Sequence, residues 1–169
     1  MYAILSNYPT QLTTAKVSLD INSVGGPKVA KKIVLLSEIG QTDIYRAVTN
    51  NKGIMNGVDS VLVATGNDYR GVEAATAVWA NKDGSYTSLS KWSIANDRLI
   101  GTVTIPLAIG VVGGSIKARQ DIQQSFNLLG KVSAEQLAEI IAATGLANNF
   151  SALLAISTKG IQAGHMKLQ

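Results

Sequence analysis

The sequence predicts a helix-rich α+β domain with a small, mostly antiparallel sheet. Residues 15–21 and 99–109 alternate apolar and polar side chains, which is typical of strands with one buried face. Apolar residues recur at helical spacing over 27–40 and 43–57, and the chain is expected to be helical after Gly110. Because strands and helices neither alternate strictly nor separate, a mixed architecture is expected.

The composition is that of a single folded domain. The chain has 169 residues, of which 46% are apolar and 15% charged; an average soluble domain has about 25% charged residues. A disordered chain is excluded, because it would be rich in charge and poor in apolar residues. So much apolar surface predicts an interface with a second chain or with another domain.

Several classes of function are disfavoured. There is no cysteine, which excludes disulfides and thiol nucleophiles, and a single histidine with 11 acidic residues makes a metal site unexpected. The net charge of +4 invites a nucleic-acid interpretation, but Lys31-Lys32 is the one tight basic pair and no aromatic residues accompany it. We therefore expect no nucleic-acid partner. The positive balance favours an anionic small molecule instead.

Two long uncharged stretches have the length of a membrane span. Residues 99–116 contain Pro106 and four glycines, and residues 140–158 contain Gly145 and two asparagines. Neither is continuously apolar, so no membrane partner is expected. The first residues lack a basic signal-peptide region, which predicts a cytoplasmic protein.

The remaining elements follow from local signals. A short apolar run is expected at 60–64, a helix near 69–80 and a strand within 85–95. Three helices are then expected: 115–129, 133–145 and 148–159. Ser133 and Gln136 have the spacing of a capping box, and Gly145 is expected to end its helix.

The helix at 43–57 has two stripes of interest. Ile44, Val48, Met55 and Val58 share one face and are expected to pack inward, whereas a second stripe holds Tyr45, Thr49, Lys52 and Asn56. Lysine and asparagine one turn apart can present donors to an anionic or carbonyl group. A solvated polar face explains the same pattern.

Two further residues have alternative interpretations. Asp68 precedes a helix, where it either caps the free amides or turns toward Lys52 and holds its ammonium group. His165 is either an exposed bystander or a proton donor near neutral pH. The glycine-rich segment 110–114 is a weak anion-binding signal that matches no dinucleotide fingerprint.

Four blocks carry a resemblance to a known family. Residues Asp43 to Gly57 contain Asn51-Lys-Gly-Ile-Met-Asn-Gly57, and Ala64-Thr-Gly-Asn-Asp68 follows. These blocks, with 110–114 and 160–166, resemble class II 3-hydroxy-3-methylglutaryl-coenzyme A (HMG-CoA) reductase. The resemblance covers essentially the whole chain, in order.

The resemblance implies a fold and a reaction. Residues 1–160 would be the C-terminal part of the large, substrate-binding domain, and 161–169 the start of a truncated flap carrying His165. The family reduces HMG-CoA to mevalonate with two equivalents of NADPH or NADH, in isoprenoid biosynthesis or, reversed, in mevalonate catabolism. It works as a homodimer with active sites at the subunit interface.

The resemblance also implies roles for individual residues. Lys52 matches the lysine that stabilises the oxyanion of the thioester, Asp68 its hydrogen-bonded aspartate, and His165 the histidine that protonates the departing coenzyme A thiolate. Arg46 and Asn56 match positions that bind the hydroxymethylglutaryl group. We therefore expect Lys52 and Asp68 to lie within ion-pair reach in one cleft with Asn56.

This sequence also departs from the family pattern. Neither the family's upstream catalytic glutamate nor the motif of its small cofactor-binding domain has a counterpart, and Asn50 and Ile44 replace the usual histidine and proline. The chain is therefore expected to be a reductase fragment that is inactive alone and pairs with a second copy or with a complementing N-terminal half. The alternative is a non-catalytic dimerising or CoA-thioester-binding module.

Overall fold

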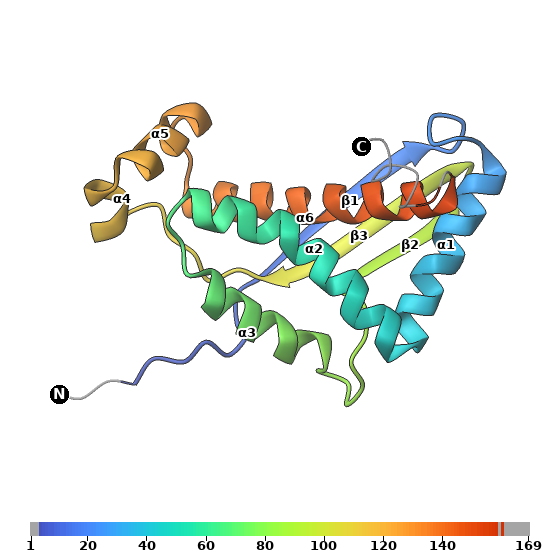
Figure 1. Ribbon diagram of the computed structural model, residues 1–169, viewed down its shortest axis with the longest axis horizontal. Coiled ribbons are helices and arrows are strands. Elements are labelled where there is room, and N and C mark those ends of the chain that lie inside the picture. The colour runs from blue at the N-terminus through green and yellow to red at the C-terminus, as the bar shows by residue number, and fades with distance from the viewer. Residues whose placement is uncertain (1–3, 159, 161–169) are drawn as a thin grey trace, which may run out of the picture.

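The computed structural model describes residues 4–158 and 160, and its elements are labelled in Figure 1. In chain order they are β1 (Leu12–Asp20), α1 (Pro27–Thr42), α2 (Ile44–Ala64), α3 (Tyr69–Ala80), β2 (Ser90–Ala95), β3 (Arg98–Pro106), α4 (Gly114–Ala118), α5 (Gln120–Leu129) and α6 (Ala134–Ser157). The expected helix-rich α+β fold is confirmed.

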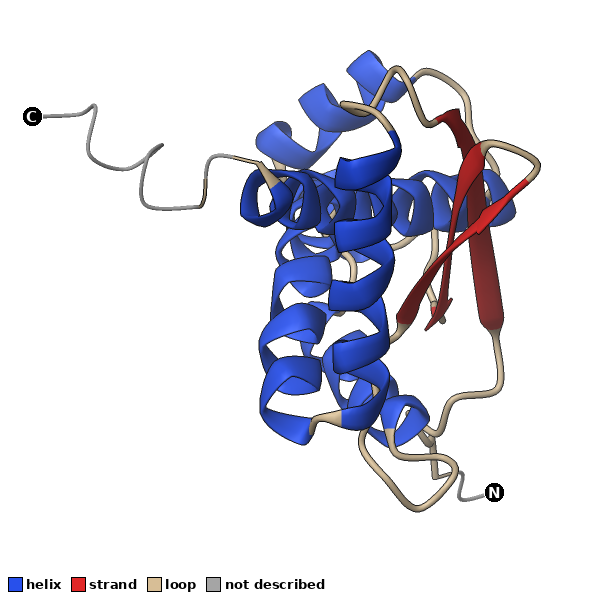
Figure 2. Ribbon diagram, turned by 90° about the vertical axis from the view of Figure 1, so that its right-hand side faces the viewer, coloured by secondary structure: helices blue, strands red, loops and turns tan. Residues whose placement is uncertain are grey.

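The three strands form an antiparallel sheet in the order β1-β3-β2. A two-residue turn at Asn96-Asp97, with φ of 49° and 56°, joins β2 to β3; such positive φ values suit the twist of a hairpin. The central strand β3 is well buried, whereas the inward residues of β1 are half-buried. Figure 2 shows the helices gathered beside the sheet.

Helix α6 is the centre of the helical layer. It crosses α2 and packs against β1, β3 and α1 (Figure 1). Among the described helices it alone is long and apolar enough to cross a membrane, by length and composition. Core helices of soluble proteins have the same properties, and α6 packs against four elements of this fold.

Two glycines mark the crossing of α2 and α6. A Cβ at Gly57 would lie 2.9 Å from the carbonyl oxygen of Thr144, and a Cβ at Gly145 would lie 2.9 Å from Cγ2 of Val58. Glycine therefore permits the two helices to approach closely.

This crossing corrects two sequence-based boundaries. The helix expected at 43–57 continues through 60–64 as one helix, α2, and the helices expected at 133–145 and 148–159 are the single helix α6. The prediction that Gly145 ends a helix was wrong, because the residue is needed for close packing. The Ser133–Gln136 capping box at the start of α6 is confirmed.

Two further expectations need correction. The helix expected at 115–129 is divided into α4 and α5, because Arg119 is extended with φ −108° and ψ 121°. Ile44 and Val48 do not pack inward: they are 54% and 52% exposed. The buried arc of α2 is centred on Ala47 and Ile54, so those two side chains lie at its edge, uncovered by any described segment.

Candidate functional site

The exposed stripe of α2 lies where the sequence predicts it. Tyr45, Thr49, Lys52 and Asn56 are all exposed. Lys52 lines a cleft of about 220 Å³ between α2 and α3, whose other walls are Val48, Asn51, Met55, Glu73, Thr76, Ala77 and Tyr86. Lys52 therefore borders a hollow that a small ligand can enter, with Asn56 one turn away.

Asn51, the residue before Lys52, clamps α2 to the segment that leads into β2. Its buried side chain donates to the carbonyl of Thr87 at 2.9 Å and accepts from the amide of Leu89 at 2.8 Å. Both ends of the amide group are thus used. The clamp fixes the turn of α2 from which Lys52 projects.

Asn50 is the hub of a second, fully buried set of hydrogen bonds. Its Nδ2 donates to Ser88 Oγ at 2.6 Å and Ser90 Oγ at 3.2 Å, and its Oδ1 accepts from Asn149 Nδ2 at 2.9 Å. Asn149 in turn accepts from Trp92 Nε1 at 2.8 Å. We call these five residues the Asn50 network; it joins α2, α6 and β2.

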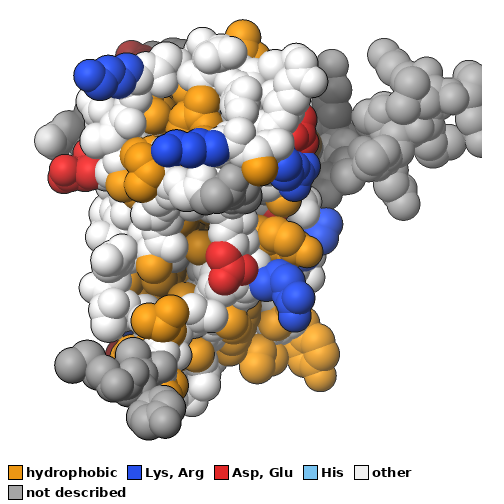
Figure 3. Space-filling model, turned by 90° about the vertical axis from the view of Figure 1, so that its left-hand side faces the viewer, with side chains coloured by type: hydrophobic (Ala, Val, Ile, Leu, Met, Phe, Trp, Pro, Cys, Tyr) orange, Lys and Arg blue, Asp and Glu red, His pale blue; other side chains and the backbone are white. Residues whose placement is uncertain are grey.

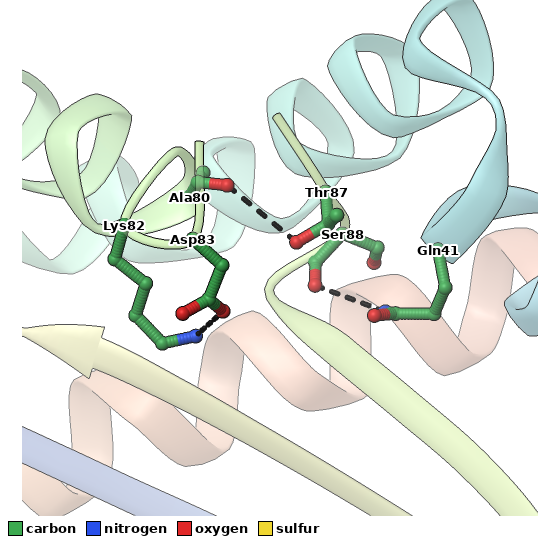
Figure 4. A network of polar contacts seen from close by, with 6 residues as sticks. All are labelled: Gln41, Ala80, Lys82, Asp83, Thr87 and Ser88. Carbon is green, nitrogen blue, oxygen red and sulfur yellow. Dashed lines mark hydrogen bonds and ion pairs between the residues drawn. The ribbon is translucent and has the colours of Figure 1, made fainter. Parts of the chain in front are cut away.

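Helix α1 also contacts the segment that leads into β2. Gln41 Nε2 donates to the carbonyls of Ser88 and Ser90 at 3.0 and 2.9 Å. Figure 4 shows Gln41 beside Ser88, with Thr87 turned toward the carbonyl of Ala80 at the end of α3. Residues 87–90 are thus held from three helices. Lys52 therefore projects from a rigid base, the kind of support that a preorganised site requires.

No role is predicted for Asn51 or Asn149 from the sequence alone, and Asn50 stands out there only as a departure from a family pattern. A signal was available, because asparagines inside predicted apolar helices must find partners if they are buried. The identity of those partners depends on the tertiary fold.

Arg46 is half-buried in the first turn of α2. Its backbone amide donates to the carboxylate of Asp43, the residue that caps the helix, at 3.0 Å. Its Nε atom is buried and has no hydrogen-bond partner within the described structure. A buried donor without a partner is costly, so this guanidinium group is suited to receive an acceptor such as a carboxylate.

Asp68 is exposed and caps α3, accepting from the amide of Gly71 at 3.0 Å. Within the described residues its carboxylate forms no ion pair with Lys52; the ion pairs found there are Lys82–Asp83 and Arg119–Asp121. The prediction that Lys52 and Asp68 meet within one chain was therefore wrong.

The length of the helices explains the separation. Helix α2 continues for twelve residues past Lys52 and ends at Ala64, a rise of roughly 18 Å. The cleft at Lys52 is reached by Thr76 and Ala77, about two turns into α3 beyond Asp68. The lysine and the aspartate thus belong to different places on the α2–α3 surface.

A pair of acids lies between these two places. Asp59 of α2 has its pKa raised to about 7 from its usual 3.8, first by burial and then by a hydrogen bond and charge repulsion with Glu73 of α3. One oxygen of Asp59 is buried without a partner in the described part of the chain. Sequence analysis did not predict this contact, because the two residues lie on separate helices.

The other predicted features fall elsewhere. His165 lies outside the described residues. Over 4–158, no three His, Asp or Glu side chains are grouped as a metal would require. Figure 3 shows single Lys and Arg side chains among hydrophobic and polar ones at the end of the molecule that carries α4 and α5, with no basic stripe on that face.

Comparison with known proteins gives consistent matches. The family model described as hydroxymethylglutaryl-coenzyme A reductase matches residues 1–169. A 3-hydroxy-3-methylglutaryl-coenzyme A reductase from Archaeoglobus fulgidus is 42% identical over 167 residues, which are 98% of this chain and 38% of that protein. A probable reductase of the same name from Borreliella burgdorferi is 42% identical over 171 residues, covering 98% and 40%.

Solved structures agree. A class II enzyme of the same name from Streptococcus pneumoniae, bound to NADPH in open conformations, is similar with a TM-score of 0.89 and 45% identity. The match covers 97% of this chain and 42% of that one. The chain thus spans about two-fifths of the length of the relatives it matches.

Proposed function

Because the chain belongs to the hydroxymethylglutaryl-coenzyme A reductase family, we propose that it forms the substrate-binding part of a reductase that converts HMG-CoA to mevalonate. One observation carries the proposal: Lys52 lines an open cleft on α2, one turn from Asn56, while the helix beneath it is fixed by buried asparagines. A solvated polar face needs no such support.

The chemistry assigned to this chain is electrostatic. The Lys52 ammonium donates hydrogen bonds to the thioester carbonyl oxygen and stabilises the negative charge that develops there during reduction. The free Nε donor of Arg46 suits a carboxylate such as that of the glutaryl group. Asn56 supplies a neutral donor and acceptor for the same hydroxymethylglutaryl group. His165 protonates the leaving thiolate in this proposal.

The separation of Lys52 from Asp68 favours a homodimer. If both residues act on one substrate, they must come from two copies of the chain. Apolar side chains are exposed beside both: Tyr45 and Val48 near Lys52, and Val63 and Tyr69 near Asp68. We propose that these side chains become buried when two copies associate, bringing Lys52 of one copy to Asp68 of the other.

The nicotinamide cofactor does not fit the residues described here. A Rossmann-type dinucleotide site uses a glycine-rich turn between a strand and a long helix whose amino terminus binds the pyrophosphate. The glycine-rich segment 110–114 leads instead into α4, a helix of five residues. We propose that NADPH or NADH is held by the part of the reductase that this chain does not span, and we derive no step through it.

The alternative is a module that binds the CoA thioester, or dimerises, without catalysis. Arg46, Lys52 and Asn56 favour it, because the contacts proposed for them are all with the substrate and none requires a nicotinamide. We propose that either function operates in the cytoplasm. The catalytic function would belong to the mevalonate pathway. Turnover of HMG-CoA in the presence of the rest of a reductase distinguishes the catalytic function from the non-catalytic one.

Binding of HMG-CoA tests the site directly. Isothermal titration should show that Lys52→Ala weakens binding to the 169-residue chain by about tenfold or more, because charge-assisted hydrogen bonds contribute roughly 1.5–3 kcal/mol. Lys31→Ala removes the same charge from the exposed face of α1 and serves as the control. Equal affinity for both variants would remove Lys52 from the site.

A further inference from the structure

The stripe of α2 that carries Lys52 and Asn56 continues to an acid. Asp59 follows Lys52 by seven residues and Asn56 by three, and these spacings put the three side chains on one face of a helix. Unlike the other two, Asp59 is half-buried, and Glu73 of α3 contacts it through a hydrogen bond between the side chains. The stripe assigned to the substrate therefore leads into a pair of carboxyl groups.

Glu73 connects this pair to the Lys52 cleft. It forms part of the cleft wall together with Thr76, which lies one turn further along α3. Lys52 and Glu73 thus border one hollow of about 220 Å³ from two helices, and no ion pair joins them in the described structure. Over so short a span, a change of charge on Glu73 acts on the Lys52 ammonium group.

Polar atoms are left open in the same wall. Asp59 Oδ1 and Thr76 Oγ1 are both buried and have no hydrogen-bond partner among the described residues. Thr76 is 3% exposed, so its hydroxyl group has lost water without gaining a partner. Buried polar groups are normally paired in native proteins. The open atoms indicate that this wall exchanges a proton or a ligand atom and is not a closed structural contact.

The carboxyl pair is suited to bind one proton. Two carboxyl groups in contact do not both ionise freely, because each charge repels the other. Burial, and then the hydrogen bond and charge of Glu73, raise the pKa of Asp59 to about 7. The pair therefore changes charge near neutral pH, at the edge of the cleft that holds Lys52.

The other helices packed on α2 bring no further charge to the pair within the described residues. Helix α6 has no charged residue after Glu139, and the charges of α5, Asp121 with Arg119 just before the helix, form an exposed ion pair. Helix α1 contacts α2 near Asn50, nine residues before Asp59. The charged groups that face the pair are thus those of the cleft itself.

We propose that Glu73, backed by Asp59, is a positioning residue for Lys52: when both carboxyl groups are ionised, they draw the ammonium group across the cleft and repel the anionic substrate. The inference rests on the proposed function, in which Lys52 binds HMG-CoA. With one proton on the pair, a single negative charge remains and Lys52 is available to the substrate. Substrate entry therefore favours the protonated pair, and affinity falls as the pH rises through about 7.

The pH dependence of KM tests the proposal in a chimera in which these 169 residues replace the matching segment of the Streptococcus pneumoniae reductase. If the fully ionised pair excludes the substrate, KM for HMG-CoA should rise roughly tenfold between pH 6 and 8, because the pair titrates near 7. Asp59→Asn leaves one carboxyl group, on Glu73, and should reduce this rise to about twofold or less.

A matched change elsewhere is the control for this measurement. Asp97→Asn, in the exposed hairpin turn, should retain the full rise of KM. The pH profile of kcat should be the same in all three proteins, because the pair acts on binding. A structural role for Asp59 would change KM or kcat at every pH without altering the slope. An equal rise of KM in the chimera and in its Asp59→Asn variant would overturn the proposal.

The NMR signal of the Lys52 side chain gives a measurement without substrate. The isolated chain carries isotope-labelled lysine, the signal is assigned with Lys52→Arg, and the exposed Lys31 is the reference. The Lys52 signal should shift with a midpoint near pH 7, and Asp59→Asn should abolish that transition while Lys31 shows none. A Lys52 signal without the transition, or a transition that survives Asp59→Asn, would overturn the proposal. An inactive chimera with the transition intact would refute the proposed function and leave the action of the pair on Lys52 standing.

Discussion

The two sides of α6 differ in how completely they are packed and hydrogen-bonded. Toward α2 the helix presents Gly145 in close contact with Val58, and Asn149 with both its amide nitrogen and its amide oxygen hydrogen-bonded. Toward β1 it presents Ala143 and Ala147, both exposed beside an apolar groove. The hydrogen-bonded support of the Lys52 cleft therefore lies within the described part of this chain, whereas the opposite side of α6 is left open there.

Neighbouring alanines give the largest expected difference between these sides. Ala142→Arg should destabilise the isolated chain by about 3–5 kcal/mol, because it buries a charge without a partner at a position with 0% exposure. Ala143→Arg should change stability by no more than about 0.5 kcal/mol. Urea unfolding measures both, and equal losses would contradict the description of an open side.

Asn149 tests the hydrogen-bonded side. Asn149→Ala should cost about 2–4 kcal/mol, because Trp92 Nε1 and Asn50 Oδ1 both lose their partner in the core. Combining it with Trp92→Phe should cost less than the sum of the single changes, since the orphaned indole donor is removed. Ser151→Ala, at an exposed position of the same helix, is the control. Additive losses in urea unfolding would show that the network is not coupled.

The helix crossing predicts opposite effects for one substitution. Gly57→Ala should destabilise by about 1–3 kcal/mol, because its Cβ meets the backbone oxygen of Thr144. Gly53→Ala, one turn earlier, meets nothing within 4 Å and should stabilise by about 0.5–1 kcal/mol. Thermal unfolding of the two variants compares them directly, and a shift of the same sign in both would be inconsistent with the close crossing.

The contact between Asp59 of α2 and Glu73 of α3 predicts a smaller, pH-dependent effect on stability. Asp59 has a pKa of about 7 when folded and about 3.8 when unfolded, so the folded chain binds this proton more tightly. Stability should therefore fall as pH rises from 4 to about 7 and level off above that value. Asp59→Asn should flatten this slope, whereas Asp97→Asn, in the exposed hairpin turn, should leave it unchanged. Urea midpoints measured across the range decide between these outcomes.

The sequence predicted the elements better than their ends. Period-two and helical patterns located the sheet and the major helices, because those patterns report which faces are buried. Glycines at 57 and 145 were interpreted as helix ends. Glycine is favoured both where a helix ends and where two helices cross closely, so the residue type alone does not distinguish the two. Which of the two applies depends on a contact between residues nearly 90 positions apart.

The exposure of the candidate residues was predictable from the sequence, and the way they are brought together was not. The stripe containing Lys52 and Asn56 follows from helical spacing alone, and it is exposed as that spacing requires. Spacing along the chain does not reveal that α2 continues for 12 residues past Lys52, which separates it from Asp68. The buried partners of Asn50 come from β2 and α6, so no local pattern identifies them.

Turnover tests the central claim, that these residues form the substrate-binding part of a reductase with Lys52 as its electrostatic group. NADPH and NADH oxidation in the presence of HMG-CoA is measured for the isolated chain, for the Streptococcus pneumoniae chimera and for the chimera with Lys52→Ala. We predict no turnover by the isolated chain, turnover by the chimera, and a loss of about 10²–10³-fold in the variant. Robust turnover by the isolated chain, or an active chimera indifferent to Lys52→Ala, would contradict the account.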